Sequence, residues 1–262
     1  MDLGLKDRVV IVTGAASGIG KAIAVAYAKE GAKLALADIN LEGLEALKKE
    51  LNAEVYIEKT DVTNADACKN FIANVAKTYG KIDVLVNNAG TALMGDMETF
   101  PEEIFRKHAE LMMYAPVRLT NLCIPHFKNN NWGSVINIAS IFGKQPGGLI
   151  SYDTIKAADI MITKDYSNYC APFNVNVNAV CPGPVDTPLW HADGQLGDQL
   201  ASATGMEKDA AIDWFAKANI PMGRYAKAEE IANAVLYLSS VPAHYITGVA
   251  LNVDGGMVKS FI

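Results

Sequence analysis

Residues 8–20 have the sequence RVVIVTGAASGIG, and this stretch decides the fold. Its run of four β-branched residues is typical of a strand that is buried on both faces. Three glycines follow, Gly14, Gly18 and Gly20, and the alanine-rich residues 21–30 after them have the composition of a helix. We therefore expect a buried strand, a glycine-rich turn and a helix, in that order.

The alternation of strand-like and helix-like segments continues along the chain. Strands are expected at residues 8–13, 33–38, 55–59, 84–86, 134–139, 174–180 and 249–253. Helices are expected at residues 21–30, 41–51, 64–79, 101–127, 151–170 and 227–238, with Asn64 as the N-cap of the third. Such alternation predicts βαβ units and a parallel sheet. Because no linker or repeat divides the chain, we expect one domain over residues 1–262.

Composition narrows the class of protein. Of the 262 residues 50% are apolar and 20% charged, and the formal net charge is −6, which argues against nucleic acid or an anionic membrane surface as partner. No apolar run approaches the ~18 residues of a membrane span, and the first residues lack a signal-peptide pattern. Four cysteines without C-x-x-C spacing and four scattered histidines predict neither disulfides nor a metal site. These features favour an enzyme or binding domain of the reducing cytoplasm.

The glycine-rich turn is a candidate dinucleotide site. Gly14 permits a tight turn, Gly18 removes a side chain where a pyrophosphate would approach, and Gly20 lets the helix pack against the sheet. Ser17 and Ile19 complete the turn, whose amide groups at the helix N-terminus would bind phosphate. The alternative is a tight turn between a strand and a helix that binds no ligand.

Acidic residues at the ends of the next two strands indicate which dinucleotide is bound. Asp38 ends the second strand, where its carboxylate can accept hydrogen bonds from the adenosine ribose and repel a 2′-phosphate. Its neighbours Ser17 and Ile39 carry no positive charge, so we expect NAD and not NADP. Asp61 and Val62 follow the third strand, where the adenine should lie. A solvated acid at a strand end remains the alternative for Asp38.

Further motifs occur in a fixed order along the chain. Together with the glycine-rich turn they are Asn87-Asn88-Ala89-Gly90, Ser140, Tyr152-x-x-x-Lys156 and Pro182-Gly183. With them the chain, from residue 6 to residue 256, resembles the short-chain dehydrogenase/reductase family in its single-domain form. The resemblance implies a three-layer, doubly wound Rossmann fold with seven parallel strands in the order 3-2-1-4-5-6-7.

The resemblance also implies roles for individual residues and an assembly. The residues implied to flank the cofactor riboses are Asn88, Ala89 and Gly90, and those implied to hold the nicotinamide are Pro182, Gly183, Val185 and Thr187. It implies a homotetramer in which the two long helices after the fourth and fifth strands form subunit interfaces. The apolar residues on these helices are equally compatible with an internal core.

Ser140, Tyr152 and Lys156 are the candidate catalytic residues. Tyr152 and Lys156 are four residues apart on an expected helix, so they share a face. A free phenol has a pKa of about 10, and both an ammonium group and the positive nicotinamide would favour its ionised form, which can then act as a general base. Ser140 could polarise the substrate oxygen. The alternatives are a solvated lysine, a half-buried aromatic residue and a serine that caps a helix.

One position departs from the family pattern. Where the family usually has an asparagine, which shapes the helix and helps a water molecule to connect the lysine with solvent, this sequence has Met112. A backbone carbonyl could still hold such a water molecule. The departure therefore weakens the expectation of turnover without removing it.

Substrate specificity is expected to depend on the irregular segment that follows the sixth strand. Residues 184–221 are predicted to form a lid, with an amphipathic helix at 208–218. The expected substrate pocket contains Met94, Phe142, Leu149, Trp190 and His191. Such a pocket suits a moderately hydrophobic secondary alcohol or ketone, because no arginine cluster is available to bind an anionic group. Alternatively, these aromatic residues form core or a subunit contact.

Three functions are compatible with these observations. The first is an NAD-dependent oxidoreductase that acts on a secondary alcohol or ketone. The second is a reductase of 3-oxoacyl thioesters, although Asp38 and the scarcity of basic residues near 125–131 argue against it. The third is a regulatory protein of the same fold that binds the cofactor without catalysis, for which Met112 is the hint.

Overall fold

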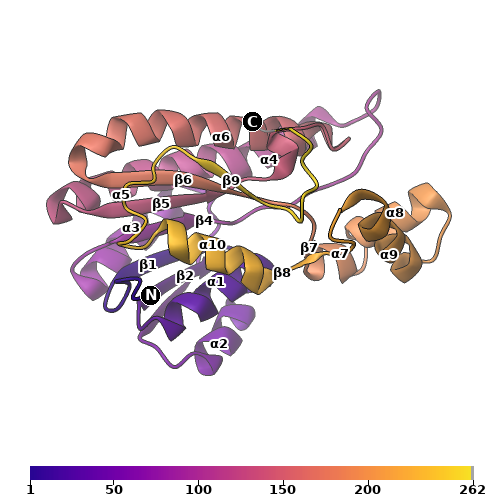
Figure 1. Cartoon of the computed structure of the whole chain (residues 1–262). Coiled ribbons are helices and arrows are strands. Elements are labelled where there is room, and N and C mark those ends of the chain that lie inside the picture. The colour runs from indigo at the N-terminus through magenta and orange to yellow at the C-terminus, as the bar shows by residue number, and fades with distance from the viewer. Residues whose placement is uncertain (261–262) are drawn as a thin grey trace.

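A seven-stranded parallel sheet forms the centre of the computed structural model, which describes residues 1–260 (Figure 1). The strands are β1 Val9–Thr13, β2 Lys33–Asp38, β3 Val55–Lys59, β4 Val84–Asn87, β5 Gly133–Ile138, β6 Val175–Pro182 and β9 Ala250–Val253. Their order is β3-β2-β1-β4-β5-β6-β9, and each neighbouring pair is parallel. The predicted order 3-2-1-4-5-6-7 is therefore confirmed, with β9 as the seventh strand. Two short strands, β7 Val185–Asp186 and β8 Ala226–Lys227, pair separately.

Helices cover both faces of this sheet and complete a three-layer Rossmann-like fold. One face is covered by α1 Gly18–Lys29, α2 Leu41–Glu50 and α10 Ala228–Leu238 (Figure 1). The other is covered by α3 Ala65–Tyr79, α5 Ala115–Asn130 and α6 Ile150–Cys170. The predicted helices at 41–51, 64–79, 151–170 and 227–238 agree with these bounds to within about one residue, and Asn64 caps α3 by accepting a hydrogen bond from the amide of Ala67.

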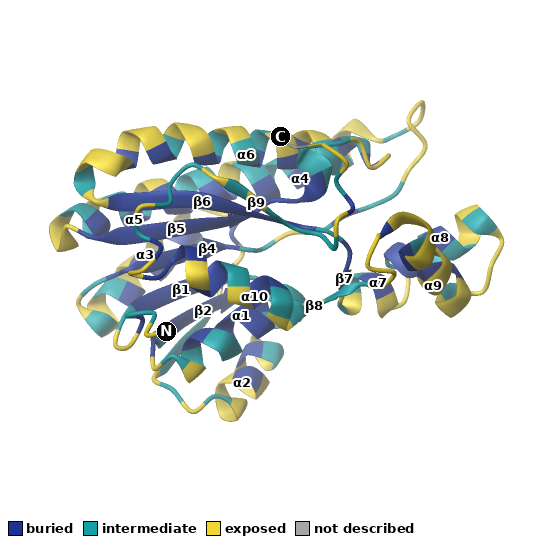
Figure 2. Ribbon diagram, in the orientation of Figure 1, coloured by how far each residue is buried: buried dark blue, intermediate teal, exposed yellow. Residues whose placement is uncertain are grey.

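The β-branched run of β1 explains why both layers pack against this strand. Val10 and Val12 face the core under α1 and α10, whereas Val9 and Ile11 face the core under α3 and α5. All four side chains are fully buried, and Figure 2 shows the central strands buried along their length. Because successive side chains of a strand point to opposite faces, one apolar run supplies both cores.

The prediction of one continuous helix over residues 101–127 is wrong, although the segment is helical. The structure divides it into α4 Glu102–Ala109, a π-helical turn η1 Glu110–Tyr114, and α5. The amide of Ala115 donates to the carbonyl of Glu110, five residues earlier. Pro116 has no amide hydrogen and cannot donate the α-helical bond to the carbonyl of Met112, so the regular pattern is interrupted here.

Residues 184–221 contain three helices that project beyond the edge of the sheet (Figure 1). They are α7 Pro188–His191, α8 Leu196–Thr204 and α9 Lys208–Asn219. The last agrees with the helix expected at 208–218, whereas α8 was not predicted. Short 3₁₀ turns, η2 Ile141–Gly143 and η3 Ala171–Phe173, precede and follow α6. Within residues 1–260 no helix is long and apolar enough to cross a membrane.

Candidate active site

A cavity of about 520 Å³ opens at the carboxyl ends of β1, β2, β4 and β5. In doubly wound sheets ligands bind at this edge. Its lining includes many of the residues predicted to bind the cofactor, namely Gly14, Ser17, Gly18, Ile19, Asp38, Asp61, Val62, Asn88, Ala89, Gly90, Tyr152, Lys156 and Thr187. The other predicted cofactor residues, Gly20, Pro182, Gly183 and Val185, are not among the residues that line it. Gly20 lies in α1, Pro182 ends β6 and Val185 begins β7. Residues that the sequence did not indicate also line the cavity, among them Thr60, Thr63, Leu111, Pro188 and Leu189.

The glycine-rich turn leaves no room for a side chain at Gly14 or Gly20. Gly14 has a φ of 64°, in the left-handed region that favours glycine. A Cβ atom on Gly20 would collide with the carbonyl oxygen of Gly14. The turn therefore lies directly on the first turn of α1 and presents main-chain atoms to the cavity.

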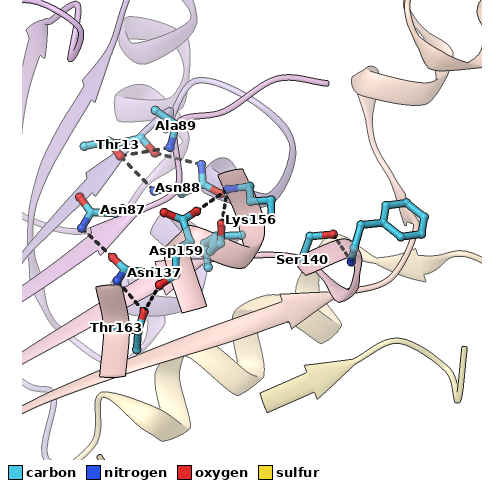
Figure 3. Close-up of polar contacts among 11 residues, drawn as sticks. Thr13, Asn87, Asn88, Ala89, Asn137, Ser140, Lys156, Asp159 and Thr163 are labelled. Carbon is cyan, nitrogen blue, oxygen red and sulfur yellow. Dashed lines mark hydrogen bonds and ion pairs between the residues drawn. The ribbon is translucent and has the colours of Figure 1, made fainter. Parts of the chain in front are cut away.

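Hydrogen bonds join this turn to the end of β4. The hydroxyl oxygen of Thr13 accepts from the amides of Asn88 and Ala89, at 3.0 and 3.2 Å. In return, the side-chain amide of Asn88 donates to the carbonyl of Thr13 at 2.9 Å (Figure 3). It also donates to the carbonyl of Gly14 at 3.1 Å. Thr13 was not among the predicted site residues, and its position as the last residue of β1 is the signal that could have indicated it.

Asp38 lies at the end of β2 with both carboxylate oxygens held. One accepts from the amide of Ala16 at 3.0 Å and the other from the amide of Asn40 at 2.9 Å. Next to it, the side chain of Ile39 is 66% exposed. Lys156 is the only basic residue among the cavity-lining residues that the structure describes. Among the described residues that line the cavity, the end around Asp38 therefore has acidic side chains and no basic one.

Asp61 and Val62 lie along the same side of the cavity. Asp61 accepts hydrogen bonds from the amide and hydroxyl of Thr63, at 2.9 and 2.7 Å. Val62 is 5% exposed and supplies an apolar surface. This pair has the acceptor and the apolar wall that the sequence predicted beside an adenine.

Tyr152 and Lys156 lie at the opposite end of the cavity, on α6. The ammonium nitrogen of Lys156 is 5.7 Å from the centroid of the Tyr152 ring. Both residues line the cavity, so the i, i+4 spacing in the sequence does place them on one face. The ammonium group of Lys156 therefore lies close to the phenol ring of Tyr152.

Ser140 is buried at the end of β5, but it is not among the residues that line the cavity. Its hydroxyl oxygen accepts a hydrogen bond from the amide of Phe142 at 3.1 Å and so caps η2 (Figure 3). The structure therefore contains the capping interaction that was the alternative for this residue. The hydroxyl hydrogen is not used by this bond and can be donated to another acceptor.

A buried carboxylate accompanies Lys156. Lys156 donates to the carbonyl of Ile138 at 2.8 Å and to a carboxylate oxygen of Asp159 at 3.0 Å (Figure 3). Burial is the largest single effect and lowers the pKa of Lys156, but the charge of Asp159, the charge of Tyr152 and the hydrogen bond to Asp159 together raise the net pKa above the usual value for lysine. Sequence reasoning missed Asp159, although the i, i+3 spacing from Lys156 on a predicted helix was a signal for it.

A chain of buried amides and hydroxyls continues from this pair beneath the site. Asn87 donates to Asn137 at 2.8 Å, and Asn137 donates to the hydroxyl of Thr163 at 2.9 Å. Thr163 in turn donates to the carbonyl of Asp159 at 2.7 Å. These bonds fix α6 against the ends of β4 and β5 (Figure 3), and no pattern in the sequence indicated them.

Met112, at the position where the family usually has an asparagine, is fully buried in η1 and lines the cavity. A Cβ atom on Gly90 would lie 3.3 Å from its sulfur, so Met112 packs against the end of β4. The residue thus supplies an apolar contact and no hydrogen-bonding side chain at this position.

The predicted substrate residues separate into two groups. Leu149 and Trp190 are buried in a small apolar core, against which Met94 and Phe142 pack together with Tyr152. His191 is instead 48% exposed, with Nε2 at 2.6 Å from a carboxylate oxygen of Asp186. The structure therefore brings four of the five together beside Tyr152 and places His191 at the surface, in hydrogen-bonding distance of Asp186.

The cavity suits a dinucleotide. It has a main-chain turn that a Cβ atom at Gly20 would disrupt, an anchored acid at the end of β2, and a buried cation at the other end. A group of side chains that could hold a metal ion does not occur among the described residues. A cavity of this kind at the carboxyl ends of the strands of a three-layer Rossmann-like fold is the architecture of a dinucleotide-binding protein.

Comparisons with known proteins define the family. A family model described as enoyl-(acyl carrier protein) reductase matches residues 14–258. The chain is 34% identical over 258 residues to the 3-oxoacyl-[acyl-carrier-protein] reductase FabG of Thermotoga maritima, covering 97% of this chain and 99% of that protein. The chain belongs to the short-chain dehydrogenase/reductase family, whose members are oxidoreductases.

Other relatives act on small polyols and sugars. The NAD-dependent glycerol dehydrogenase of Listeria innocua is 32% identical over 97% of this chain and 95% of its own. The crystal structure of L-sorbose reductase from Gluconobacter frateurii, complexed with NADPH and L-sorbose, has a TM-score of 0.92 and 32% identity over the whole of both chains. Similar proteins therefore differ in both cofactor and substrate.

Proposed function

We propose that this oxidoreductase transfers a hydride between NAD(H) and a moderately hydrophobic secondary alcohol or ketone. The observation that supports the proposal is that Tyr152, Lys156 and Asp38 line one cavity, where they could serve as base, cation and ribose acceptor. Bound NAD would supply the hydride acceptor for oxidation, and NADH the donor for reduction.

In this proposal the residues of the chain move and hold the proton. Tyr152 accepts the hydroxyl proton of the alcohol at its phenol oxygen, or donates it to the carbonyl in the reverse direction. Lys156, whose ammonium nitrogen lies 5.7 Å from the centroid of the Tyr152 ring, stabilises the ionised phenol. Ser140 donates its hydroxyl hydrogen to the substrate oxygen while its own oxygen accepts from Phe142. Because Lys156 is buried, its charge is screened little by water and acts more strongly on the phenol than a solvated charge would.

NAD is proposed over NADP because of the charge around Asp38. A 2′-phosphate would lie close to the carboxylate of Asp38 and be repelled by it. The next residue, Ile39, has no positive charge that could offset this repulsion. The relatives include a protein named as NAD-dependent and one complexed with NADPH, so the preference depends on this local charge.

Residues 184–221 are proposed to act as a substrate lid on a single catalytic unit formed by residues 1–262. Trp190 packs against Phe215 of α9 and against Tyr225, with ring centroids 5.6 and 5.0 Å apart. The proposed pocket lies where this core meets Met94, Phe142, Leu149 and Tyr152. His191 is also proposed to contact the substrate, but its ring must first break its hydrogen bond with Asp186.

The proposed function is tested with a panel of cyclic and aromatic secondary alcohols and NAD or NADP. Absorbance at the reduced nicotinamide band should rise with NAD and at least one alcohol. Binding of NAD without turnover of any alcohol or ketone would instead favour a regulatory protein, for which Met112 is the observation. Preferential binding of NADP, measured by calorimetry, would contradict the assignment of Asp38.

A second candidate is the reduction of 3-oxoacyl thioesters, which the name of the Thermotoga maritima relative favours. An enzyme of this kind is expected to act with NADPH on a thioester and to leave simple secondary alcohols unchanged. Activity confined to a 3-oxoacyl thioester would therefore replace the first proposal with the second.

We also propose a homotetramer in a reducing compartment. Exposed apolar side chains lie on α6, on α10 and at the last strand, namely Met161 and Tyr169, Tyr237, and Leu251. A groove between α5 and α6 is lined by Ile124, Pro125, Tyr166 and Tyr169, among other residues. All four cysteines are free and buried, as thiols of a reducing compartment would be. Light scattering that gives the mass of a monomer would contradict this assembly.

A further inference from the structure

The charge pair of Lys156 and Asp159 lies inside the protein. Lys156 is 6% exposed and Asp159 is 3% exposed, and the ammonium nitrogen is 3.0 Å from one carboxylate oxygen. The second carboxylate oxygen of Asp159 is buried without a hydrogen-bond partner among the described residues. Burying a carboxylate that is not fully hydrogen-bonded costs free energy, so packing alone does not explain an acid at this position.

We propose that Asp159 is a positioning residue, which keeps Lys156 protonated and holds its ammonium at the catalytic end of the cavity. This inference rests on the proposed function, because that function gives Lys156 its task. Asp159 itself does not line the cavity, so it acts through Lys156 and not on the substrate.

The position of the pair on α6 shows which way the ammonium faces. Tyr152, Lys156 and Asp159 follow one another at i, i+4 and i+7 along α6, which places them on one face of the helix. Lys156 therefore lies between the phenol and the carboxylate. Thr163 holds the backbone beneath Asp159 by donating to its carbonyl at 2.7 Å. The carboxylate and the carbonyl of Ile138 together fix the ammonium from two sides.

Without a carboxylate, burial would favour a neutral amine at Lys156. Buried lysines lose the hydration of their charge, and their pKa falls unless a partner compensates. Here burial does lower the pKa of Lys156, but Asp159, followed by Tyr152 and Cys181, raises it above the usual value. Removing the carboxylate while keeping the burial should therefore reverse the direction of the net shift. An uncompensated buried charge also destabilises the fold.

Other titratable groups near this part of α6 do not replace Asp159. Cys181 on β6 acts on Lys156 from another element, and burial raises its pKa to about 11, so it is a neutral thiol near pH 7. Lys144, which follows η2, donates to the carbonyl of Ala250 and adds positive charge. On α4 and η1, His108 is hydrogen-bonded to Ser151 and Glu110 is paired with Arg118.

The test is a direct titration of lysine side chains by NMR, with ¹³C at Cε, in the protein without substrate or dinucleotide. The resonance of Lys156 is assigned by its loss in Lys156→Met. In Asp159→Asn we expect its titration midpoint to fall by roughly one to three pH units relative to the unaltered protein. Asp159→Glu should keep most of the original midpoint. Asp165→Asn is the control, because Asp165 is an exposed carboxylate on the same helix.

An unchanged midpoint in Asp159→Asn would overturn the proposal. The unaltered protein supplies a second test in case that variant does not fold: its Lys156 must titrate at or above the exposed lysines, and a midpoint below them would also overturn the proposal. With NAD and an oxidisable alcohol, kcat/KM of Asp159→Asn should decline at alkaline pH near its NMR midpoint. A shifted midpoint in a protein that turns over no substrate would support the role of Asp159 and count against the proposed function.

Discussion

The two ends of the cavity are built from different parts of the chain. At the end where the dinucleotide phosphates and ribose would lie, main-chain atoms dominate: the turn at Gly14, the amide of Ala16 on Asp38, and the amides of Asn88 and Ala89 on Thr13. At the other end, the chemistry depends on the side chains of α6 and on a charge pair inside the protein.

This difference determines how each end responds to change. A site made of main-chain atoms is sensitive to added volume, because a new Cβ atom moves several hydrogen bonds at once. A site made of side chains is sensitive to the loss of single polar atoms and to pH, because each proton has one acceptor. Variants at the two ends should therefore separate binding of the dinucleotide from its use.

The largest expected effect is on turnover in Tyr152→Phe. Removing one oxygen takes away the proposed proton acceptor, so kcat should fall by about 10²–10⁴-fold. The affinity for NAD should change by less than about threefold, because the ring and Lys156 remain. Stopped-flow absorbance and calorimetry measure the two quantities. Tyr169→Phe, an exposed tyrosine on the same helix, is the control that should keep full activity. Comparable kcat values for Tyr152→Phe and the unaltered protein would reject Tyr152 as the base.

Gly20→Ala should have the opposite pattern. Its new Cβ atom collides with the carbonyl of Gly14, so the turn must move. We expect a loss of about 1–3 kcal/mol in the free energy of unfolding, as for other overpacked sites, and a loss of NAD affinity of at least tenfold. Denaturant unfolding and calorimetry measure these effects.

The control for this change is Gly80→Ala. Gly80 has a positive φ, of 75°, but no atom lies within 4 Å of the position that a Cβ atom would take there. This variant should lose about 1–2 kcal/mol through backbone strain and keep its NAD affinity. Equal NAD binding by both variants would mean that the turn does not contact the dinucleotide.

A smaller effect is expected from Asp38→Asn, which removes the charge but keeps the shape of the side chain. The ratio of NAD to NADP affinity should fall by about tenfold, because repulsion of about 1.4 kcal/mol between two close anions is lost. Asp61→Asn, at the end of the next strand, should alter both affinities alike and leave the ratio unchanged. A constant ratio in Asp38→Asn would show that another residue selects the cofactor.

Much of the first end of the cavity could be predicted from the sequence, since it follows from local pattern. The β-branched run and the glycines fix a strand, a turn and a helix within a dozen residues, and Asp38 follows from the end of β2. The order of the sheet follows from the family motifs and from the right-handed crossovers of βαβ units. These features depend on neighbours in the sequence or on rules that hold for all such sheets.

The other end depends on contacts between distant residues, which periodicity does not reveal. Spacing places Asp159 on the face of Lys156, but not its burial or its approach to Ile138. Likewise, the chain of Asn87, Asn137 and Thr163 joins residues that are 26 and 50 positions apart. The break of the helix at η1 can be attributed to Pro116 only when the turns on both sides of it are known to be helical, which the sequence alone does not establish.

The smallest effect is expected from a change in the proposed lid, residues 184–221. The side-chain oxygen of Gln199 on α8 accepts from the amide of Met94 at 2.8 Å, so one hydrogen bond connects the lid to the segment after β4. Gln199→Ala should raise KM for the alcohol about two- to tenfold, because such a bond contributes about 0.5–1.5 kcal/mol, and should leave NAD affinity unchanged. Gln195→Ala, at the N-cap of the same helix, is the control. Since Met94 belongs to the proposed pocket and Gln199 to the lid, an unchanged KM would show that α8 covers core and not substrate.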